Sequence, residues 1–413
     1  MTIDLEATDR FLAALDAAAD DDAMRRLFAA YSAQYELDVP ADPFGDAYRR
    51  VQFDLYERLH GRPYATSHEH SPLDLEVSSV RPFPYVHGSP QTVGDHLMGI
   101  GFLIRAMNLS RGARVLEFGP GWGNTTLALA KMGCEVTAVD IEPNFVELIR
   151  RRAQMEKLDN LTVVQGDFLS LELQQERFDA VLFFECFHHC ADHFRLMKAF
   201  DKAVKPGGIV CFAAEPILDD FPLPWGLRMD GQSLWAIRRN GWLELGFNTR
   251  YFEQAMARAG WWVQHLKGSD SALASAFIAR RLDDTTRHWD YGQGMLRSAV
   301  GEVRGTEIVS DGRPGYLMFG PYVQVAPGPY QARVQISGSQ VASGTCLLEI
   351  ACDAGNTVLA SVDVQLHAGL GEMSLPFTAA RLIDDFEVRV RGAGGTVVAL
   401  SGMSLVRQVP VGT

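Results

Sequence analysis

Glycines at alternate positions directly follow a short apolar segment that contains one acidic residue. The segment is 115–118 with Glu117 in it, and Gly119, Gly121 and Gly123 come next, before a run of small and apolar residues. Glycine is needed where the backbone turns with positive φ or approaches a ligand closely. A strand, a glycine turn and a helix N-terminus in this order predict a nucleotide-type pocket at the carboxyl edge of a parallel sheet.

The glycine spacing and the acid before it narrow the choice of ligand. A dinucleotide fingerprint would place its third glycine at position 124, where this chain has Asn124, and Gly123 gives the pattern G-x-G-x-G instead. The Glu117 carboxylate would repel a pyrophosphate, whereas it suits a ligand that carries an ammonium group. S-adenosylmethionine is such a ligand, because it has an amino-acid head, a positive sulfonium and no phosphate.

This segment resembles motif I of the class I S-adenosylmethionine-dependent methyltransferases. The resemblance continues in order over roughly residues 94 to 281, through further expected strands at 135–140, 161–168, 178–184 and 209–214. It implies an α/β fold with a doubly wound, Rossmann-like, mostly parallel sheet.

The resemblance also implies which residues bind the cofactor. Asp140 lies roughly 20 residues beyond the glycine turn, where an acid binds ribose hydroxyls. Asp167 matches the acid that meets the adenine amino group, and Phe168 matches a residue that packs on the ring. The expected cofactor-binding residues are Glu117, Gly119, Pro120, Gly121, Gly123, Asn124, Asp140, Ile141, Asp167, Phe168 and Glu185.

The residues after the fourth expected strand face the methyl group in this fold. They include Glu185, His188 and His189, which are the expected catalytic residues. Methyl transfer to a hydroxyl needs alignment and removal of a proton. Because imidazole has a pKa of roughly 6.5, either histidine suits the role of base. The alternative is that His189 packs or caps the following helix and that Glu185 only braces the loop.

The sequence predicts no metal site. Histidines and cysteines gather between positions 186 and 193, but no second pair with zinc-ligand spacing follows elsewhere. A second group, at 68–70 with Asp95 and His96, contains side chains that could bind a divalent ion or the acceptor. Histidines in a surface loop are the simpler interpretation of that group.

Composition restricts the partners of the chain. The net charge of −13 over 413 residues argues against a nucleic-acid acceptor and against an anionic membrane surface. Acidic residues stand near the N-terminus, where a signal peptide would carry positive charge, so we expect a cytoplasmic protein. The six scattered cysteines are consistent with reduced, packed thiols.

Three parts follow one another along the chain. We expect a helical cap at 1–90, the cofactor-binding domain at 91–285, and an all-β sandwich of jelly-roll type at 300–413. The last part has short alternating runs separated by turn residues, and it resembles carbohydrate-binding modules in architecture alone. The aromatic segment 217–247 is expected to form a lid, with Trp225, Arg228 and Asp230 as substrate-binding residues.

These features lead to three hypotheses. The first is a methyltransferase that acts on a hydroxyl of a sugar or glycan intermediate. The second keeps methyl transfer but takes a small metabolite as acceptor, with the β-sandwich as an oligomerisation module in a homo-oligomer. The third is a non-catalytic scaffold that only binds the cofactor.

Overall fold

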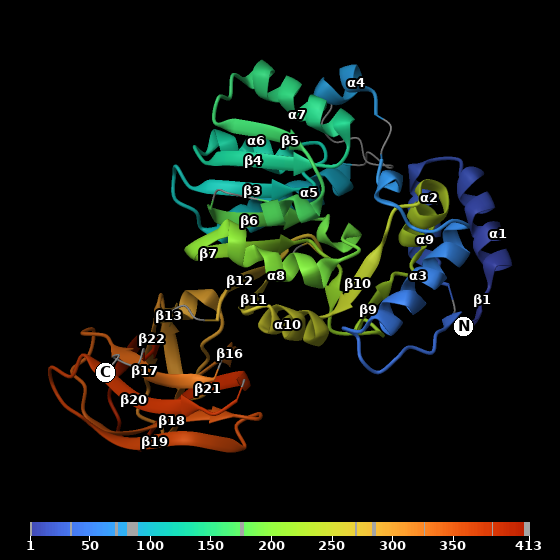
Figure 1. Ribbon diagram of the computed structural model, residues 1–413. Helices are drawn as coiled ribbons and strands as arrows, with labels where there is room; N and C mark the ends of the chain where they lie inside the picture. Colours follow the sequence, from blue (N-terminus) through green and yellow to red (C-terminus); the bar gives the residue numbers. More distant parts are fainter. Residues whose placement is uncertain are drawn as a thin grey trace. The chain divides into compact units, whose positions relative to one another are not determined.

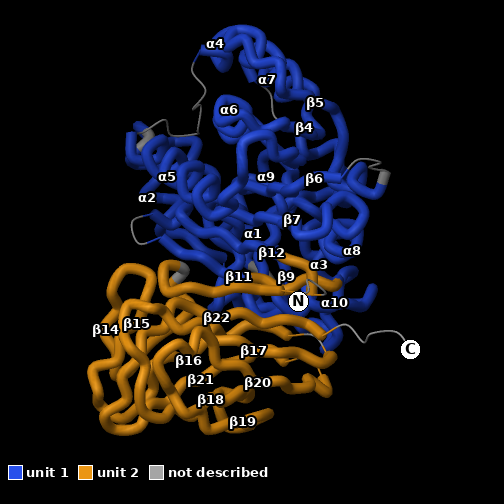
Figure 2. The backbone as a smooth tube through the Cα atoms, turned by 90° about the vertical axis from the view of Figure 1, so that its left-hand side faces the viewer, with its two compact units in different colours: residues 1–259, 264–279 blue, residues 260–263, 280–413 orange. Residues whose placement is uncertain are grey.

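The structure is a computed structural model that divides into two compact units (Figure 2). Unit 1 comprises residues 1–259 and 264–279, and unit 2 comprises residues 260–263 and 280–413. The structure describes residues 2–33, 35–70, 73–80, 90–173, 177–268, 271–282, 286–325, 327–381 and 383–408.

A mostly parallel sheet forms the centre of unit 1 (Figure 1). Its order is β11-β12-β7-β6-β3-β4-β5, in which β3 to β7 pair in parallel and β12 runs antiparallel to β7. The strands are β3 (Arg114–Phe118), β4 (Glu135–Asp140), β5 (Leu161–Gln165), β6 (Phe178–Phe184), β7 (Val204–Ala213), β11 (Trp261–Lys267) and β12 (Ser275–Arg281). The predicted Rossmann-like sheet is therefore confirmed.

Helices cover both faces of this sheet. Helices α5 (Pro90–Met107) and α6 (Asn124–Lys131) pack on the face that carries Val115 and Val136, and α7 (Pro143–Glu156) packs against Ala138 on that face. Helices α8 (His193–Ala203) and α10 (Thr249–Arg258) cover the other face. The local sequence explains where α7 begins, because Pro143 suits the first helical position and the Glu142 side chain accepts a hydrogen bond from the Asn144 amide.

Stacked phenylalanines on the second face hold three central strands together. The ring of Phe183 on β6 is 5.4 Å from that of Phe118 on β3 and 5.3 Å from that of Phe212 on β7, with interplanar angles of 6° and 10°. All three side chains are buried, and Phe200 of α8 and Phe252 of α10 pack on them. This packing fixes the strands whose carboxyl ends carry the candidate site.

The N-terminal helices pack against a segment that follows β7. They are α1 (Leu5–Asp16), α2 (Asp21–Ala30), α3 (Asp46–His60) and α4 (Leu75–Val80), with short strands β1 (Thr2–Ile3) and β2 (Tyr35–Glu36). Residues 217–248 contain β8 (Ile217–Leu218), β9 (Trp225–Leu227), α9 (Gly231–Asn240) and β10 (Leu245–Asn248). An apolar cluster of α1 and α2 packs on Trp235, and the Tyr48 hydroxyl donates to the Trp225 carbonyl at 2.7 Å.

The expected aromatic lid at 217–247 is therefore wrong as a description of this segment. Its aromatic residues pack against the N-terminal helices and so give it regular helix and strands instead of a long loop. Helix α2 begins after Asp20, which is its N-cap and whose side chain accepts a hydrogen bond from the Ala23 amide.

Unit 2 is a β domain of two antiparallel sheets. One has the order β14-β15-β22-β17-β20, with β13 paired to β22, and the other has the order β16-β21-β18-β19. Phe377 and Phe386, from different sheets, stack with ring centres 5.3 Å apart. The strands are β13 (Thr286–Trp289), β14 (Gly301–Arg304), β15 (Glu307–Ser310), β16 (Gly315–Val325), β17 (Gly328–Ile336), β18 (Gly344–Cys352), β19 (Thr357–Leu366), β20 (Glu372–Ala379), β21 (Ile383–Gly392) and β22 (Ala399–Arg407).

Among the described residues, no helix combines the length and the apolar character that a membrane crossing requires.

Replacing Phe183 by alanine tests the importance of the stacked rings. The Phe183→Ala variant should lose about 3–5 kcal/mol of unfolding free energy, because it removes a fully buried ring and leaves a cavity between its two neighbours. Leu218→Ala, at a half-exposed position of the same unit, should change stability by less than about 0.5 kcal/mol. Urea denaturation measures the unfolding free energy of both variants. Equal losses in the two would contradict the stabilising role of the stacked rings.

Candidate active site at the carboxyl edge of the sheet

The structure explains why glycine stands at each of three positions in the turn after β3. Gly119, Gly121 and Gly123 have φ values of +57°, +52° and +75°, in the left-handed region. A Cβ atom on Gly119 would lie 2.6 Å from the Cys186 Cβ, and one on Gly123 would lie 2.6 Å from Ile149. A Cβ on Gly121 would meet no atom within 4 Å, so the space above this residue is open to a ligand.

Glu117 is a buried carboxylate on the inner side of this turn. It is 1% exposed, and its Oε2 accepts a hydrogen bond of 2.6 Å from the Thr126 hydroxyl of α6. Burial raises the pKa of Glu117 to about 7, the Thr126 hydrogen bond opposes this rise, and the nearby Asp140 carboxylate adds to it. An ammonium group bound here would offset the cost of burying the charge.

Asp140 connects the end of β4 to the glycine turn. Its Oδ2 accepts from the Gly121 amide at 3.0 Å, and its Oδ1 accepts from the Glu142 amide at 2.9 Å. Burial raises the pKa of Asp140 to about 6, against the lowering effect of these backbone hydrogen bonds. The carboxylate therefore lies beside the open space above Gly121, where the ribose of the expected cofactor would need it.

The remaining predicted cofactor residues surround the same edge of the sheet. The Asp167 carboxylate accepts from the Ser170 amide at 3.0 Å, and the Phe168 ring lies 5.9 Å from that of Phe118. The Asn124 side chain accepts from Arg152 at 3.0 Å. Pro120 and Ile141 are half-buried, in the turns after β3 and β4.

Glu185 directly follows β6 in a left-handed conformation, with φ of +52°. Its amide donates to the Ala213 carbonyl at 3.1 Å, and its Oε2 lies 3.4 Å from His96 Nδ1. A residue other than glycine in this conformation is strained, and such strain concentrates at functional sites. Glu185 therefore lies at the same carboxyl edge as Glu117, as predicted.

Glu215 organises the chain after β6, and the sequence analysis missed it. Its side chain is 0% exposed and accepts from the amides of Cys186 and Phe187 at 2.8 Å each and from the His188 amide at 3.2 Å. It also accepts from His188 Nδ1 at 2.8 Å. Burial alone would raise the pKa of Glu215, but His188 and these amides hold it below its ordinary value. The signal available in the sequence was its place directly after a predicted strand.

Two more acids join the histidines from distant parts of unit 1. Glu244, just before β10, has its Oε2 3.7 Å from His188 Nε2, and Glu69 has its Oε2 3.3 Å from His189 Nδ1. We call Glu69, His188, His189, Glu215 and Glu244 the histidine cluster. Burial disfavours the charged imidazolium of His189, but the carboxylates, Glu69 first, raise its pKa to about 9.

The second predicted histidine group does not form one site. The Nδ1 of His70 lies 2.6 Å from Glu142, and that of His96 lies beside Glu185. The His68 ring instead packs at a tilt against that of His60, with ring centres 4.9 Å apart and an interplanar angle of 55°. The structure thus disperses this group over several partners, while Glu69 from the same segment joins the histidine cluster.

The predicted substrate residues have structural partners. Trp225 is 3% exposed, its indole nitrogen donates to the Pro43 carbonyl at 2.8 Å, and its ring packs on Tyr48 and His193. It is therefore part of the packed interior and cannot stack on a sugar.

The other two predicted substrate residues interact with each other. Asp230 is the N-cap of α9, and it pairs at 3.0 Å with Arg228, which also lies 3.5 Å from Glu244. Asp230 therefore has a capping role, while Arg228 borders the histidine cluster.

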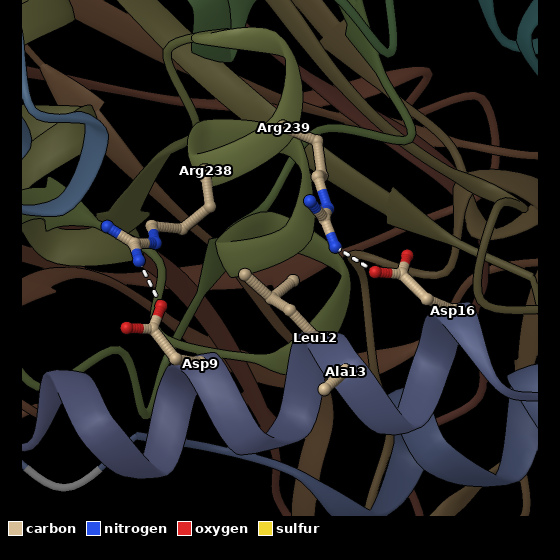
Figure 3. A pocket seen from close by; sticks show the side chains of 6 residues that line it. All are labelled: Asp9, Leu12, Ala13, Asp16, Arg238 and Arg239. Carbon is tan, nitrogen blue, oxygen red and sulfur yellow. Dashed lines mark hydrogen bonds and ion pairs between the residues drawn. The ribbon is translucent and has the colours of Figure 1, made fainter.

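A separate surface pocket lies between α1 and α9 (Figure 3). Arg238 pairs with Asp9 and Arg239 pairs with Asp16, on either side of Leu12 and Ala13. Because its charges are already paired, the pocket contains no group that is poised for chemistry.

Comparisons with known proteins agree with this geometry. Residues 116–212 match the family model of a methyltransferase domain. An S-adenosyl-L-methionine-dependent Diels-Alderase of Talaromyces variabilis is 34% identical over 130 residues, or 31% of this chain and 42% of that protein. A ubiquinone biosynthesis O-methyltransferase of Coxiella burnetii is 32% identical over 103 residues, or 25% of this chain and 44% of that protein. The chain thus spans less than half the length of these two relatives.

Solved structures with similar folds include methyltransferases and a cyclase. The CcbJ methyltransferase of Streptomyces caelestis has a TM-score of 0.35 at 16% identity, covering 45% of this chain and 88% of that one. The [4+2]-cyclase SpnF has a TM-score of 0.35 at 18% identity, and the match covers 56% of this chain and 76% of that one.

Together, the matched family model and the strand order identify the Rossmann-like fold of class I methyltransferases in unit 1. The matched relatives imply S-adenosylmethionine as the cofactor, which confirms the prediction. The residues present fit this group. Glu117 is a buried acid suited to its ammonium group, Gly121 leaves room above the turn, and Asp140 is suited to its ribose.

Removing the charge of Glu117 should weaken cofactor binding. Glu117→Gln keeps the size of the side chain and an acceptor for Thr126, but it cannot pair with an ammonium group. We expect the dissociation constant for S-adenosylhomocysteine to rise about 10- to 100-fold, as for the loss of a charged hydrogen bond. Calorimetry measures it, with Glu135→Gln at an exposed position of β4 as the control. Unchanged affinity in Glu117→Gln would rule out this role.

The raised pKa values of Glu117 and Asp140 predict a pH dependence of stability without cofactor. In the unfolded chain these groups titrate near pH 4, whereas in the folded protein they titrate near 7 and 6. Their contribution to stability is therefore fully present below about pH 4 and is lost as the pH rises through about 6 and 7. Between about pH 5 and pH 8, the wild type should lose stability relative to Glu117→Gln in urea denaturation. Parallel pH curves for the two proteins would contradict the prediction.

Proposed function

We propose that the chain is an S-adenosylmethionine-dependent methyltransferase that methylates a hydroxyl oxygen of a sugar or glycan intermediate. One observation carries the proposal. The glycine turn with Glu117 and the loop with His188 and His189 follow β3 and β6, which are adjacent strands of the sheet. A site for the cofactor and a site for proton transfer thus share one edge of the sheet.

The chemistry divides between the cofactor and the protein. When bound, S-adenosylmethionine supplies a methyl group whose bond to the acceptor oxygen forms as its bond to sulfur breaks, and that electron pair stays on sulfur. The protein must align the acceptor and take the proton of its hydroxyl.

We assign the proton transfer to the histidines, and to His188 first. Glu215 is an ionised carboxylate that can only accept hydrogen bonds, so His188 Nδ1 must donate to it. The lone pair of this imidazole then lies on Nε2, which can accept a proton. His189, paired with Glu69, and Glu185, paired with His96, complete the acceptor side.

The choice of a sugar acceptor rests on the β domain. We take its two sheets to pack as a sandwich of the carbohydrate-binding type, which the stacking of Phe377 on Phe386 supports. Residues 1–90 then act as a cap over the acceptor, since Glu69 from this part reaches the histidine cluster.

Two other candidates have their own support. A relative named for ubiquinone biosynthesis favours a small-metabolite acceptor, with the β domain as an oligomerisation module. A relative named as a Diels-Alderase shows that a similar domain can use the cofactor in another class of reaction, and a non-catalytic scaffold would also keep Glu117 and Asp140.

Labelled methyl groups can separate these candidates. The full chain is incubated with methyl-labelled S-adenosylmethionine and a cell lysate, which is then fractionated by size. We expect the label in high-mass carbohydrate. Label in small metabolites would favour the second candidate, and no label despite cofactor binding would exclude methyl transfer to any acceptor in that lysate.

A double variant tests the role assigned to the histidines. In the accepting fraction, His188→Ala with His189→Ala should lower turnover about 100- to 10,000-fold, the range of general acid–base catalysis. The affinity for S-adenosylhomocysteine should stay within about threefold of the wild type, because Glu117 and Asp140 are unchanged. His288→Ala, at an exposed position of β13, is the control. Full turnover in the double variant would show the assignment to be wrong.

A further inference from the structure

The histidine cluster concentrates negative charge in the interior of unit 1. The side chains of Glu69 and Glu244 are 10% exposed and that of Glu215 is 0% exposed. The Arg228 guanidinium reaches Glu244 but is shared with Asp230. Buried carboxylates need compensating positive charge. The surroundings of His188 and His189 therefore favour a cation.

The positions of the donor atoms define what kind of cation would fit. One ligand atom from each of His188, His189 and Glu244 lies within 4.8 Å of the others, and His188 Nε2 is 3.7 Å from Glu244 Oε2. Three side chains that converge in this way can share one ion between them.

A carboxylate lies near the Nδ1 atom of each ring. His188 Nδ1 is 2.8 Å from Glu215, and His189 Nδ1 is 3.3 Å from Glu69. Histidines that bind metals almost always donate their other N–H to a carboxylate, a carbonyl or a water, which fixes the tautomer and the ring orientation. Because Glu215 holds His188 Nδ1, the second nitrogen of His188, Nε2, faces Glu244 in the interior of the cluster.

We propose that His188, His189 and Glu244 bind a divalent first-row transition-metal ion, with Glu215 and Glu69 orienting the two imidazoles. Two nitrogen donors suit ions such as Zn²⁺ or Co²⁺, whereas Mg²⁺ and Ca²⁺ prefer oxygen ligands. Three protein ligands leave a coordination position open, as in catalytic zinc sites.

The role of this ion rests on the proposed methyl transfer, although its binding does not. An acceptor hydroxyl in the open position would have a lowered pKa and would release its proton to solvent. His188 would then be a ligand, so its role as a free base holds only for a metal-free site. Loss of turnover in the double histidine variant is expected in both cases, and a direct measurement of metal binding must separate them.

Cobalt titration of the full chain, after removal of metals with a chelator, tests the site. We expect one Co²⁺ per chain by calorimetry, with visible absorption bands that indicate nitrogen ligands. The double histidine variant and Glu244→Gln should lose this site. Glu69→Gln, which keeps an acceptor for the Leu243 amide, should bind about 10- to 100-fold more weakly. His288→Ala should bind like the wild type.

S-adenosylhomocysteine binding is measured on the same proteins, and it confirms that each variant folds. Absence of cobalt binding in the wild type, or binding as tight as that of the wild type in Glu244→Gln or in the double histidine variant, would overturn the metal site. If cobalt fails to bind while S-adenosylhomocysteine binds, the metal site fails and the proposed function, with His188 as base, is not contradicted. If cobalt binds as expected and S-adenosylhomocysteine does not, the proposed function fails and the metal site stands.

Discussion

The site depends on one buried carboxylate, Glu215, which fixes the chain after β6. Its two oxygens accept three successive backbone amides and the Nδ1 of His188. Without it, these donors would be buried without partners, and each would cost free energy. The orientation of His188, and hence its approach to Glu244, follows from this interaction.

Three buried acids at the same edge of the sheet show how hydrogen-bond donors and nearby charges set the pKa of a carboxyl group. Burial raises the pKa of Glu117 and of Asp140, each of which has fewer compensating donors, while Glu215 keeps a low pKa among its amides and an imidazole. Glu215 is thus satisfied within the protein and serves a structural purpose. Glu117 and Asp140 retain capacity for a ligand, which is what a binding site requires.

The packing beneath the sheet edge keeps these groups in register. Phe118, Phe183 and Phe212 stack across β3, β6 and β7, and the glycine turn, the histidine loop and Glu215 follow these same strands. Because protein interiors are closely packed, a shift of one strand would displace the others. The aromatic face therefore connects the glycine turn to the loop that carries His188 and His189.

The sequence by itself determined the central sheet and the glycine turn beside the acids Glu117 and Asp140, because these features rest on local patterns. Apolar strands, glycine spacing and strand-end acids such as Glu117 and Asp140 are close together in the chain, and parallel strands bring their carboxyl ends to one edge. The short alternating runs that form β16 to β22 could also be recognised in the sequence, because alternation is a local pattern.

Only the tertiary structure decided which side chains contact the two histidines and how the aromatic segment 217–247 packs. Glu69, Glu215 and Glu244 are far apart in the sequence, and no local spacing relates them to His188 and His189. An indole ring such as that of Trp225 could stack on a sugar, but this ring is buried against Tyr48 and Pro43, which lie far from it in the sequence. Periodicity and spacing report on neighbours along the chain, whereas charge compensation and burial depend on contacts that form only when distant segments pack.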